Sequence, residues 1–259
     1  MLAGYPHFVN LARRLQWDAD AIDLGADARA WPDVDPRTRA RLMTLIAGFA
    51  VGEAAVAGEL APFAAHAEDP HMRAAFDAQT RDEERHAAFF DRVAAEVARV
   101  PGDTPDDRRL ALRETLAERY VELFERRLPE VARELALGGT SLGEAVGMYH
   151  MVLEGVVFSA GQVTFLEVLG GDPQPSLPGL RRGVELVTRD ERWHVGLGTR
   201  ALLGAGLTGA AAMRVLAEGE AAADVWAEVA DDATVARARA IHRRRLATIG
   251  IRAPDAARV

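Results

Sequence analysis

The sequence carries the same short pattern twice, a glutamate followed three residues later by a histidine. The first copy is Glu83 with His86, and the second is Glu191 with His194. On an α-helix a residue and its third successor lie on one face, so each pair can direct a carboxylate and an imidazole to one point. One such pair arises easily by chance, whereas two copies constrain the fold strongly.

Each pair is preceded along the chain by an isolated glutamate within an apolar run. Glu53 lies within residues 45–56, and Glu154 lies within residues 149–158. The chain therefore reads twice as a lone glutamate followed by Glu-x-x-His, the arrangement with which a four-helix bundle holds two metal ions at its centre. We predict an all-α fold, a four-helix bundle with additional flanking helices.

Caps, prolines and glycines mark the ends of the expected helices. An aspartate followed by proline favours a helix start, because the carboxylate caps backbone N–H groups and proline fits the first turn. We expect helices from Pro36 to about His66, from Pro70 to Val100, from Pro105 to Gly138 with a kink or break near Pro129, from Leu142 to Gly170, from the loop at residues 172–175 to about Gly204, and from Gly209 to Arg245 with a break at Asp231.

The rest of the chain shows no sign of a second domain. Residues 1–34 read as a partly helical lead-in with Trp17 and Trp31 as packing anchors. The polar third helix is expected on the outside of the bundle, because it has no lone carboxylate on an apolar stripe. No linker or shift in composition appears, so residues 1–259 are predicted to form a single helical domain.

Charge and cysteine content exclude several classes of function. The 31 basic and 39 acidic residues give a net charge of −8, which argues against binding nucleic acid. The chain has no cysteine, so disulfides, thiolate zinc sites and cysteine nucleophiles are excluded. The absence of cysteine suits a reducing compartment, and a secretory signal is not evident. We expect a cytoplasmic protein.

Two apolar stretches, residues 43–63 and 142–169, are long enough to raise the question of a membrane span. Each carries acidic residues, and a carboxylate within hydrocarbon is costly. Both stretches also contain many small residues, which is natural in a bundle core. We expect no membrane span.

Four glutamates at the core of a bundle would need compensation. An ionised group buried alone costs roughly several kcal/mol or more. Two divalent cations would neutralise all four, and a donor set of carboxylates and imidazoles without thiolate suits iron or manganese, with zinc also compatible. The six candidate ligands are Glu53, Glu83, His86, Glu154, Glu191 and His194.

Two aspartates directly precede the second and fourth of the candidate glutamates. Asp82 and Asp190 are placed so that each could accept the outer N–H of a ligand histidine and fix its ring, although solvent-facing acids would read the same way. Glu59 is the rival of Glu53 but lies nearer the end of its helix. The remaining histidines have no partner at ligand spacing and are expected to be structural or exposed: His7, His66, His71, His150 and His242.

A dinuclear centre with open positions can activate O2, generate a stable radical or store iron. The residue one helical turn after His86 is Phe90. A tyrosyl radical at that position is therefore excluded.

Taken together, these residues resemble the R2-like ligand-binding oxidases, relatives of the ribonucleotide reductase small subunit in the ferritin-like superfamily. The resemblance extends from Trp17 to the segment at residues 189–194. The six-ligand pattern is shared by all R2-like proteins, whereas Val56 and Tyr149 are more specific, standing three residues after Glu53 and five before Glu154.

The resemblance implies a particular chemistry. In the oxidase group the residues at these two offsets become joined by an ether bond between the valine β-carbon and the tyrosine oxygen, formed when a Mn/Fe centre reacts with O2. The group also holds a long-chain fatty acid over the centre, and a homodimer is expected. By the resemblance Glu53, Glu83 and His86 would hold manganese, while Glu154, Glu191 and His194 would hold iron, with Glu83 as the bridge; Fe/Fe is the alternative.

Helix geometry supports half of the implied cross-link. Val56 shares a face with Glu53, but Tyr149 lies about 140° from Glu154 around an ideal α-helix. A π-bulge in this helix, common at such sites, would bring Tyr149 to the metals. Small residues nearby leave room for an elongated apolar ligand or permit close helix packing: Gly52, Ala57, Gly155, Ala160 and Gly161.

Our leading hypothesis is an O2-dependent Mn/Fe oxidase that attacks a C–H bond. The first alternative is a ribonucleotide reductase radical-generating subunit without a tyrosyl radical, although residues 249–259 contain no tyrosine to relay a radical. An iron-storage or structural bundle is the third.

Overall fold

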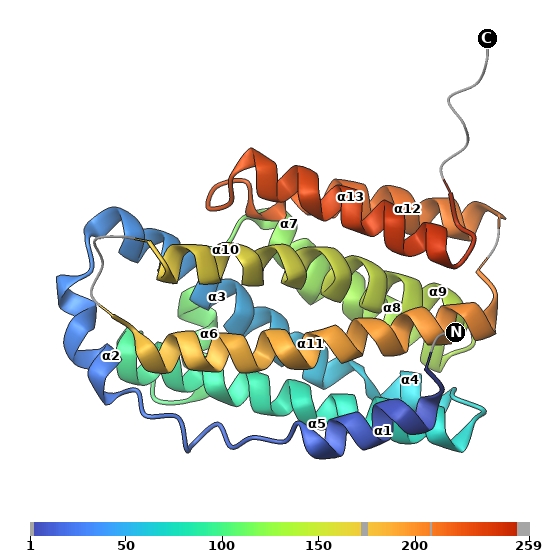
Figure 1. Cartoon of the computed structure of the whole chain (residues 1–259), viewed down its shortest axis with the longest axis horizontal. Coiled ribbons are helices and arrows are strands. Elements are labelled where there is room, and N and C mark those ends of the chain that lie inside the picture. Colours follow the sequence, from blue (N-terminus) through green and yellow to red (C-terminus); the bar gives the residue numbers. More distant parts are fainter. Residues whose placement is uncertain (1–2, 172–175, 208, 253–259) are drawn as a thin grey trace, which may run out of the picture.

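The fold is known from a computed structural model, which describes residues 3–171, 176–207 and 209–252. Four long helical rods lie side by side and form the predicted bundle (Figure 1). They are α3 (Pro36–Glu59), α5 (Pro70–Arg92), the rod built of α9 (Leu142–Val146), the π-helical η4 (Gly147–Phe158) and α10 (Ser159–Leu169), and α11 (Pro178–Ala205).

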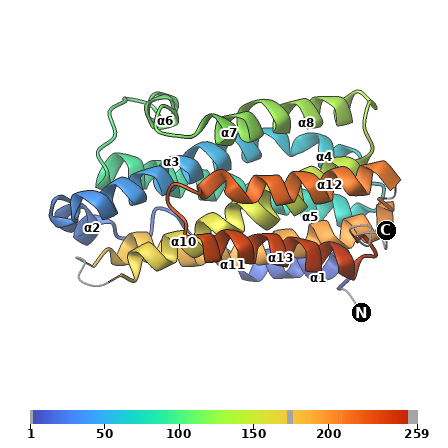
Figure 2. The same ribbon diagram turned by 90° about the horizontal axis from the view of Figure 1, so that it is seen from above.

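Shorter helices cover the bundle on its sides. The layer formed by α6–α8 and the pair α12–α13 lie over different faces, and α1 runs beside α5 and α11 (Figure 2). These elements are α1 (Tyr5–Arg14), α2 (Gly25–Ala30), η1 (Trp31–Asp33), α4 (Ala61–Ala65), η2 (Val93–Val97), α6 (Pro105–Arg113), α7 (Glu118–Val121), η3 (Glu122–Arg127), α8 (Leu128–Ala136), α12 (Gly209–Ala222), η5 (Ala223–Trp226) and α13 (Asp232–Thr248).

The predicted caps begin three of the four ligand-bearing rods: α3, α5 and the rod that starts with α9. The Asp35 carboxylate accepts from the N–H groups of Arg37 and Thr38 at 3.0 and 3.1 Å, and Asp69 accepts from His71 at 2.7 Å. Ser141 and Glu144 form a reciprocal capping box. Each satisfies donors that the first turn of a helix leaves without partners.

Of the kink or break expected near Pro129, the break is wrong. The chain leaves the helix between Arg113 and Glu118, while Pro129 is the second residue of α8, directly after the π-helical segment η3. The missing N–H of proline therefore falls where the hydrogen-bond register changes, and the rod continues through it. The break expected at Asp231 is confirmed, because Asp231 caps α13. The expected loop at residues 172–175 lies outside the described residues.

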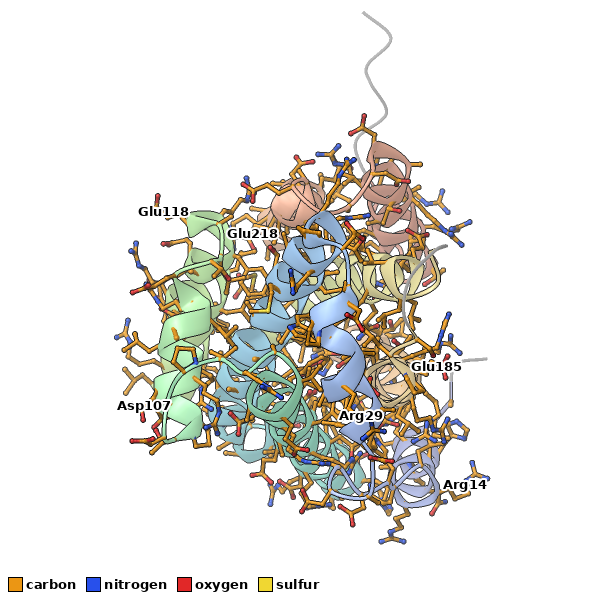
Figure 3. All side chains as sticks on the ribbon, turned by 90° about the vertical axis from the view of Figure 1, so that its left-hand side faces the viewer. Arg14, Arg29, Asp107, Glu118, Glu185 and Glu218 are labelled. Atoms are coloured by element: carbon orange, nitrogen blue, oxygen red, sulfur yellow. The ribbon has the colours of Figure 1, made fainter. Side chains whose placement is uncertain are left out.

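Two of the rods pass a test of length and hydropathy for a membrane span. They are residues 36–65 and 142–169, and their most apolar windows are 61% and 72% buried inside the fold. Each contributes a buried glutamate to the bundle interior, Glu53 or Glu154. This burial is the behaviour of core helices. Charged side chains such as Arg14, Asp107, Glu118 and Glu185 instead surround the bundle at its periphery (Figure 3).

Close packing between α5 and α11 depends on Gly183. A Cβ atom built on Gly183 would lie 1.9 Å from Phe89 Cζ, whereas one built on Gly58 of α3 would meet no atom of the described residues within 4 Å. We predict that Gly183→Ala lowers the free energy of unfolding by about 1–3 kcal/mol through overpacking. The matched variant Gly58→Ala should raise it by roughly 0.5–1 kcal/mol, since alanine favours a helix. Urea unfolding of the metal-free protein measures both, and equal effects would contradict the packing described.

Candidate metal centre

The six predicted ligands meet at the centre of the bundle. Glu53 comes from α3, Glu154 from η4, and the two Glu-x-x-His pairs from α5 and α11. Glu191 is 2% exposed and the other five side chains are 0% exposed. Glu59, the rival of Glu53, is only partly buried and belongs to neither group of converging ligand atoms.

The ligand atoms form two overlapping groups, each with its atoms within 4.8 Å of one another. One group is Glu53, Glu83, His86 and Glu191, and the other is Glu83, Glu154, Glu191 and His194. The resemblance implied that Glu83 bridges the two ions. In this geometry Glu83 and Glu191 both belong to both groups, so either carboxylate can span two ions.

Both imidazoles direct Nδ1 at the carboxylates. His86 Nδ1 lies 3.2 Å from Glu83, 3.5 Å from Glu53 and 3.6 Å from Glu191. His194 Nδ1 lies 3.0 Å from Glu83 and 3.5 Å from Glu191. The Nδ1 atoms therefore face the position at which the carboxylates converge, which assigns them as the candidate donor atoms.

The outer nitrogen of each ring faces a buried aspartate from the opposite helix. Asp190 of α11 lies 3.4 Å from Nε2 of His86, and Asp82 of α5 lies 3.5 Å from Nε2 of His194. Both aspartates are 0% exposed, so the solvent-facing reading does not apply. Such a carboxylate fixes the ring and keeps the proton on Nε2, leaving Nδ1 for a metal.

Arg85 joins the two aspartates. Its guanidinium lies 2.7 Å from Asp82 and 3.1 Å from Asp190, and it sits over the Trp17 ring at 5.1 Å. The Trp17 indole donates to Asp190 at 2.7 Å and stacks on His86 with ring centroids 6.2 Å apart. Trp17 is thus more than the packing anchor that the sequence suggested. A hydrogen-bonded chain runs from the cluster to this partly exposed side chain.

The π-helix that the Tyr149 geometry required is present. Segment η4 spans Gly147–Phe158, and in a π-helix the i→i+5 spacing stacks residues five apart. Tyr149 accordingly contacts the Glu154 carboxylate and donates to Glu83 Oε1 at 2.9 Å. The phenol oxygen therefore lies against two of the candidate ligands. Val56 is buried three residues after Glu53.

Sequence reasoning missed Gln79 and gave His150 no partner. Gln79 is fully buried on α5, and its Nε2 lies 2.8 Å from Tyr149 Oη and 2.9 Å from Glu154 Oε1. Its Oε1 lies 3.0 Å from His150 Nε2. Burial lowers the pKa of His150 to about 3, so the neutral ring donates to this oxygen and holds the amide orientation. Gln79 stands four residues before Glu83, and this helical spacing could have revealed it.

Protons neutralise part of the cluster in the metal-free protein. Burial raises the pKa of both Glu53 and Glu154 well above the ordinary value. Burial also disfavours the charge on Glu83, but the positive charge of His194 holds its pKa well below the ordinary range. For Glu191, burial and the negative charge of Glu83 act to raise the pKa, but the neighbouring Glu154 and the charge of His194 lower it.

The imidazoles retain protons as well. Burial opposes their charge, yet the hydrogen bond to Asp190 raises the pKa of His86, and the negative charge of Glu83 raises that of His194, both well above the ordinary value. The raised pKa values of these four groups, two carboxyls and two imidazoles, favour bound protons, which offset part of the charge of the cluster. All six ligand side chains, fully deprotonated, carry a charge that two divalent cations would balance.

The donor set fits such a pair of ions. Several buried ligand atoms have no hydrogen-bond partner within the described part of the chain, although they lie among other polar groups: both carboxylate oxygens of Glu53 and of Glu191, Oε2 of Glu154, and Nδ1 of His194. Partnerless buried atoms of this kind are costly unless another species completes their coordination. Carboxylate oxygens and imidazole nitrogens suit iron and manganese. Phe90 fills its predicted place and stacks on Phe49 at 5.0 Å.

Known proteins share this architecture. The family described as ribonucleotide reductase, small chain, matches residues 5–202. A tyrosine-to-phenylalanine mutant of an R2-like ligand-binding oxidase with aerobically reconstituted Mn/Fe cofactor is 20% identical, with 96% of this chain and 85% of that chain covered at a TM-score of 0.67. A valine-to-isoleucine mutant with anaerobically reconstituted Mn/Fe cofactor gives a TM-score of 0.68 at the same identity and coverage. No curated protein sequence matches.

The fold and the buried cluster define a ferritin-like, R2-type helical bundle. Because the family match spans most of its length, the chain belongs to the ribonucleotide reductase small-chain family. The resemblance to R2-like proteins inferred from the sequence is confirmed, and the oxidases share the fold.

The protonation pattern predicts how metal binding depends on pH. Two divalent ions must displace protons from four groups, because the pKa of each is raised above its ordinary value: Glu53, Glu154, His86 and His194. We expect binding of Mn²⁺ to release protons near neutral pH, so that affinity rises with pH. Calorimetry in two buffers of different ionisation enthalpy counts the protons. A binding heat independent of the buffer, with unchanged affinity between about pH 6 and 8, would contradict this pattern.

Proposed function

We propose that this protein is an O2-dependent oxidase with a dinuclear Mn/Fe centre. Glu53, Glu83 and His86 would hold one ion, and Glu154, Glu191 and His194 the other, with Glu83 or Glu191 between them. The observation that carries the proposal is the convergence of six buried ligands, four of which have side-chain atoms without a hydrogen-bond partner among the described residues. When bound, the metal pair supplies the electrons and oxidising power for reaction with O2.

The surrounding residues of the chain orient and shield this site. Asp82 and Asp190 fix the two imidazoles. Gln79 keeps Tyr149 against Glu83 and Glu154, and the phenol proton has a carboxylate acceptor within hydrogen-bond distance. Burial of every ligand excludes bulk water, which protects an oxidising site from side reactions.

The proposed first substrate is the protein itself. Ether formation joins Val56 Cβ to Tyr149 Oη, with loss of one hydrogen from each residue, and O2 accepts these two electrons and two protons. The position of the Tyr149 oxygen beside Glu83 and Glu154 supports this assignment. So does the burial of Val56 on the helix that carries Glu53.

A long-chain fatty acid is the proposed bound ligand, and the solved oxidases with this fold are described as ligand-binding. The space beside the glycines that were expected to leave room for this ligand is occupied by side chains of the protein itself. Cβ atoms on Gly52, Gly155 and Gly161 would meet Tyr120, Arg245 and Trp226. These glycines therefore serve close packing. Extraction of purified protein and mass spectrometry of the extract tests for the ligand separately.

By family resemblance we also propose a cytoplasmic homodimer.

The cross-link has a direct test. Metal-free protein supplied with Mn²⁺ and Fe²⁺ in air should lose the mass of two hydrogens, and digestion should yield a linked peptide pair containing Val56 and Tyr149. Tyr149→Phe should bind the same metals without any loss of mass, because it lacks the oxygen. An unchanged mass for the fully metal-loaded wild type would refute ether formation.

The family match favours one second candidate, a ribonucleotide reductase small subunit without a tyrosyl radical. The chain of Trp17, Asp190 and His86 would give a radical a hydrogen-bonded route from the cluster. Ribonucleotide reduction on mixing the metal-loaded protein with a reductase large subunit would establish this function in place of the oxidase.

A further inference from the structure

The π-helical segment η4 needs support from outside itself. It extends over 12 residues, and all of them are buried. π-helices are rare and mostly occur as single-turn bulges, so one of this length must gain stability from its surroundings. Its register is also what stacks Tyr149 on Glu154. Whatever holds η4 in this register therefore holds the phenol at the candidate metal centre.

Three side chains donate hydrogen bonds to backbone carbonyls within one stretch of η4. Ser159 Oγ donates to the carbonyl of Glu154 at 2.9 Å. Arg245 Nη1 donates to that of Gly155 at 2.9 Å, and Trp226 Nε1 donates to that of Val157 at 2.8 Å. A carbonyl oxygen has two lone pairs, and in a water-free core only protein donors can satisfy them. Two of these three donors, Trp226 of η5 and Arg245 of α13, come from the segment that follows the bundle along the chain.

The missing Cβ of Gly155 leaves the space that the Arg245 guanidinium occupies. A Cβ at Gly155 would lie 2.3 Å from Arg245 Nη1. Arg245 lies on α13, which packs against α12 through the buried His242. The Nε2 atom of His242 lies 3.2 Å from the Val215 carbonyl, and its ring packs directly against Gly219. The position of the Arg245 guanidinium therefore depends on the packing of α13 against α12.

Trp226 is inserted between two rods that carry candidate ligands. A Cβ at Gly48 of α3 would lie 2.2 Å from the indole Cη2, and one at Gly161 of α10 would lie 2.9 Å from Cε2. The indole is 2% exposed and stacks on Phe49 at 6.0 Å. It therefore fixes the spacing of α3 and α10 while its N–H holds η4.

We propose that the segment from η5 to α13 is a clamp on η4, with Arg245 and Trp226 as positioning residues that keep the Tyr149 oxygen against Glu83 and Glu154. The family match ends at residue 202, so the clamp is built from residues outside the matched region. The inference concerns the geometry of the metal-free protein, and it rests on the proposed function only in naming the Tyr149 oxygen as the reacting atom.

The first test removes the guanidinium. In metal-free Arg245→Met, amide hydrogen exchange of peptides covering residues 147–158 should become about tenfold faster, since a buried hydrogen bond to the segment is lost. Arg244→Met is the matched control, because Arg244 lies on the same helix directly before Arg245 and is exposed. The control should leave exchange of 147–158 unchanged. Equal exchange in both variants would overturn the clamp.

The second test reads the phenol directly. Ultraviolet resonance Raman bands of tyrosine report phenol hydrogen bonding, and Tyr149→Phe identifies the contribution of Tyr149 to the wild-type spectrum. In Arg245→Met and Trp226→Phe the part of the Tyr149 signal that reports its hydrogen bonding should disappear. In Arg245→Lys, which keeps a donor, part of this signal should remain. An intact Tyr149 signal in both of the first two variants would refute a positioning role.

The metal-loaded protein separates this inference from the proposed function. If the wild type forms the cross-link, Arg245→Met should bind two equivalents of metal but form markedly less ether. If the wild type forms none, the oxidase proposal fails, while the exchange and Raman results still decide the clamp. Folding of each variant is checked by its unfolding transition, and Arg245→Lys provides the milder variant should Arg245→Met fail to fold.

Discussion

The structure depends on placing four glutamates in the middle of an apolar bundle. Glu53, Glu83, Glu154 and Glu191 come from four different rods and are buried together. Their mutual repulsion and lost hydration would exceed the stabilisation available to a domain unless positive charge were brought in. In the metal-free chain the raised pKa values of two carboxyls and two imidazoles favour bound protons that meet part of this need, and two cations would meet it otherwise. Toward the surface, the positive charge of Arg85 likewise compensates the buried carboxylates of Asp82 and Asp190.

The helices are shaped around that cluster. The i, i+3 spacing of an ordinary α-helix suffices for the two Glu-x-x-His pairs, whereas Tyr149 and Glu154, five residues apart, require the π-helical register of η4. Glycines then let other elements approach closely. Arg245 approaches at Gly155, and Trp226 at Gly48 and Gly161. The flanking helices are thereby joined mechanically to the centre.

The sequence predicted the cluster well because helical periodicity is local. Glu53 was separable from Glu59 by its depth in an apolar run, and the angle between Tyr149 and Glu154 correctly indicated a π-bulge. Long-range packing was not predictable in this way. Nothing near Arg245 or Trp226 in the sequence shows that their donors reach η4, and the break near Pro129 was misplaced because the adjacent π-turn absorbs the missing N–H. Gln79 was overlooked because an amide carries no charge that demands a partner.

The central claim is that the six ligands hold two metal ions, and anomalous scattering from a crystal loaded with Mn²⁺ and Fe²⁺ tests it most directly. Data collected on either side of the manganese and iron absorption edges should show two peaks within the cluster, one bounded by Glu53 and His86 and the other by Glu154 and His194. Fully folded protein with no anomalous peak at these side chains would contradict the account.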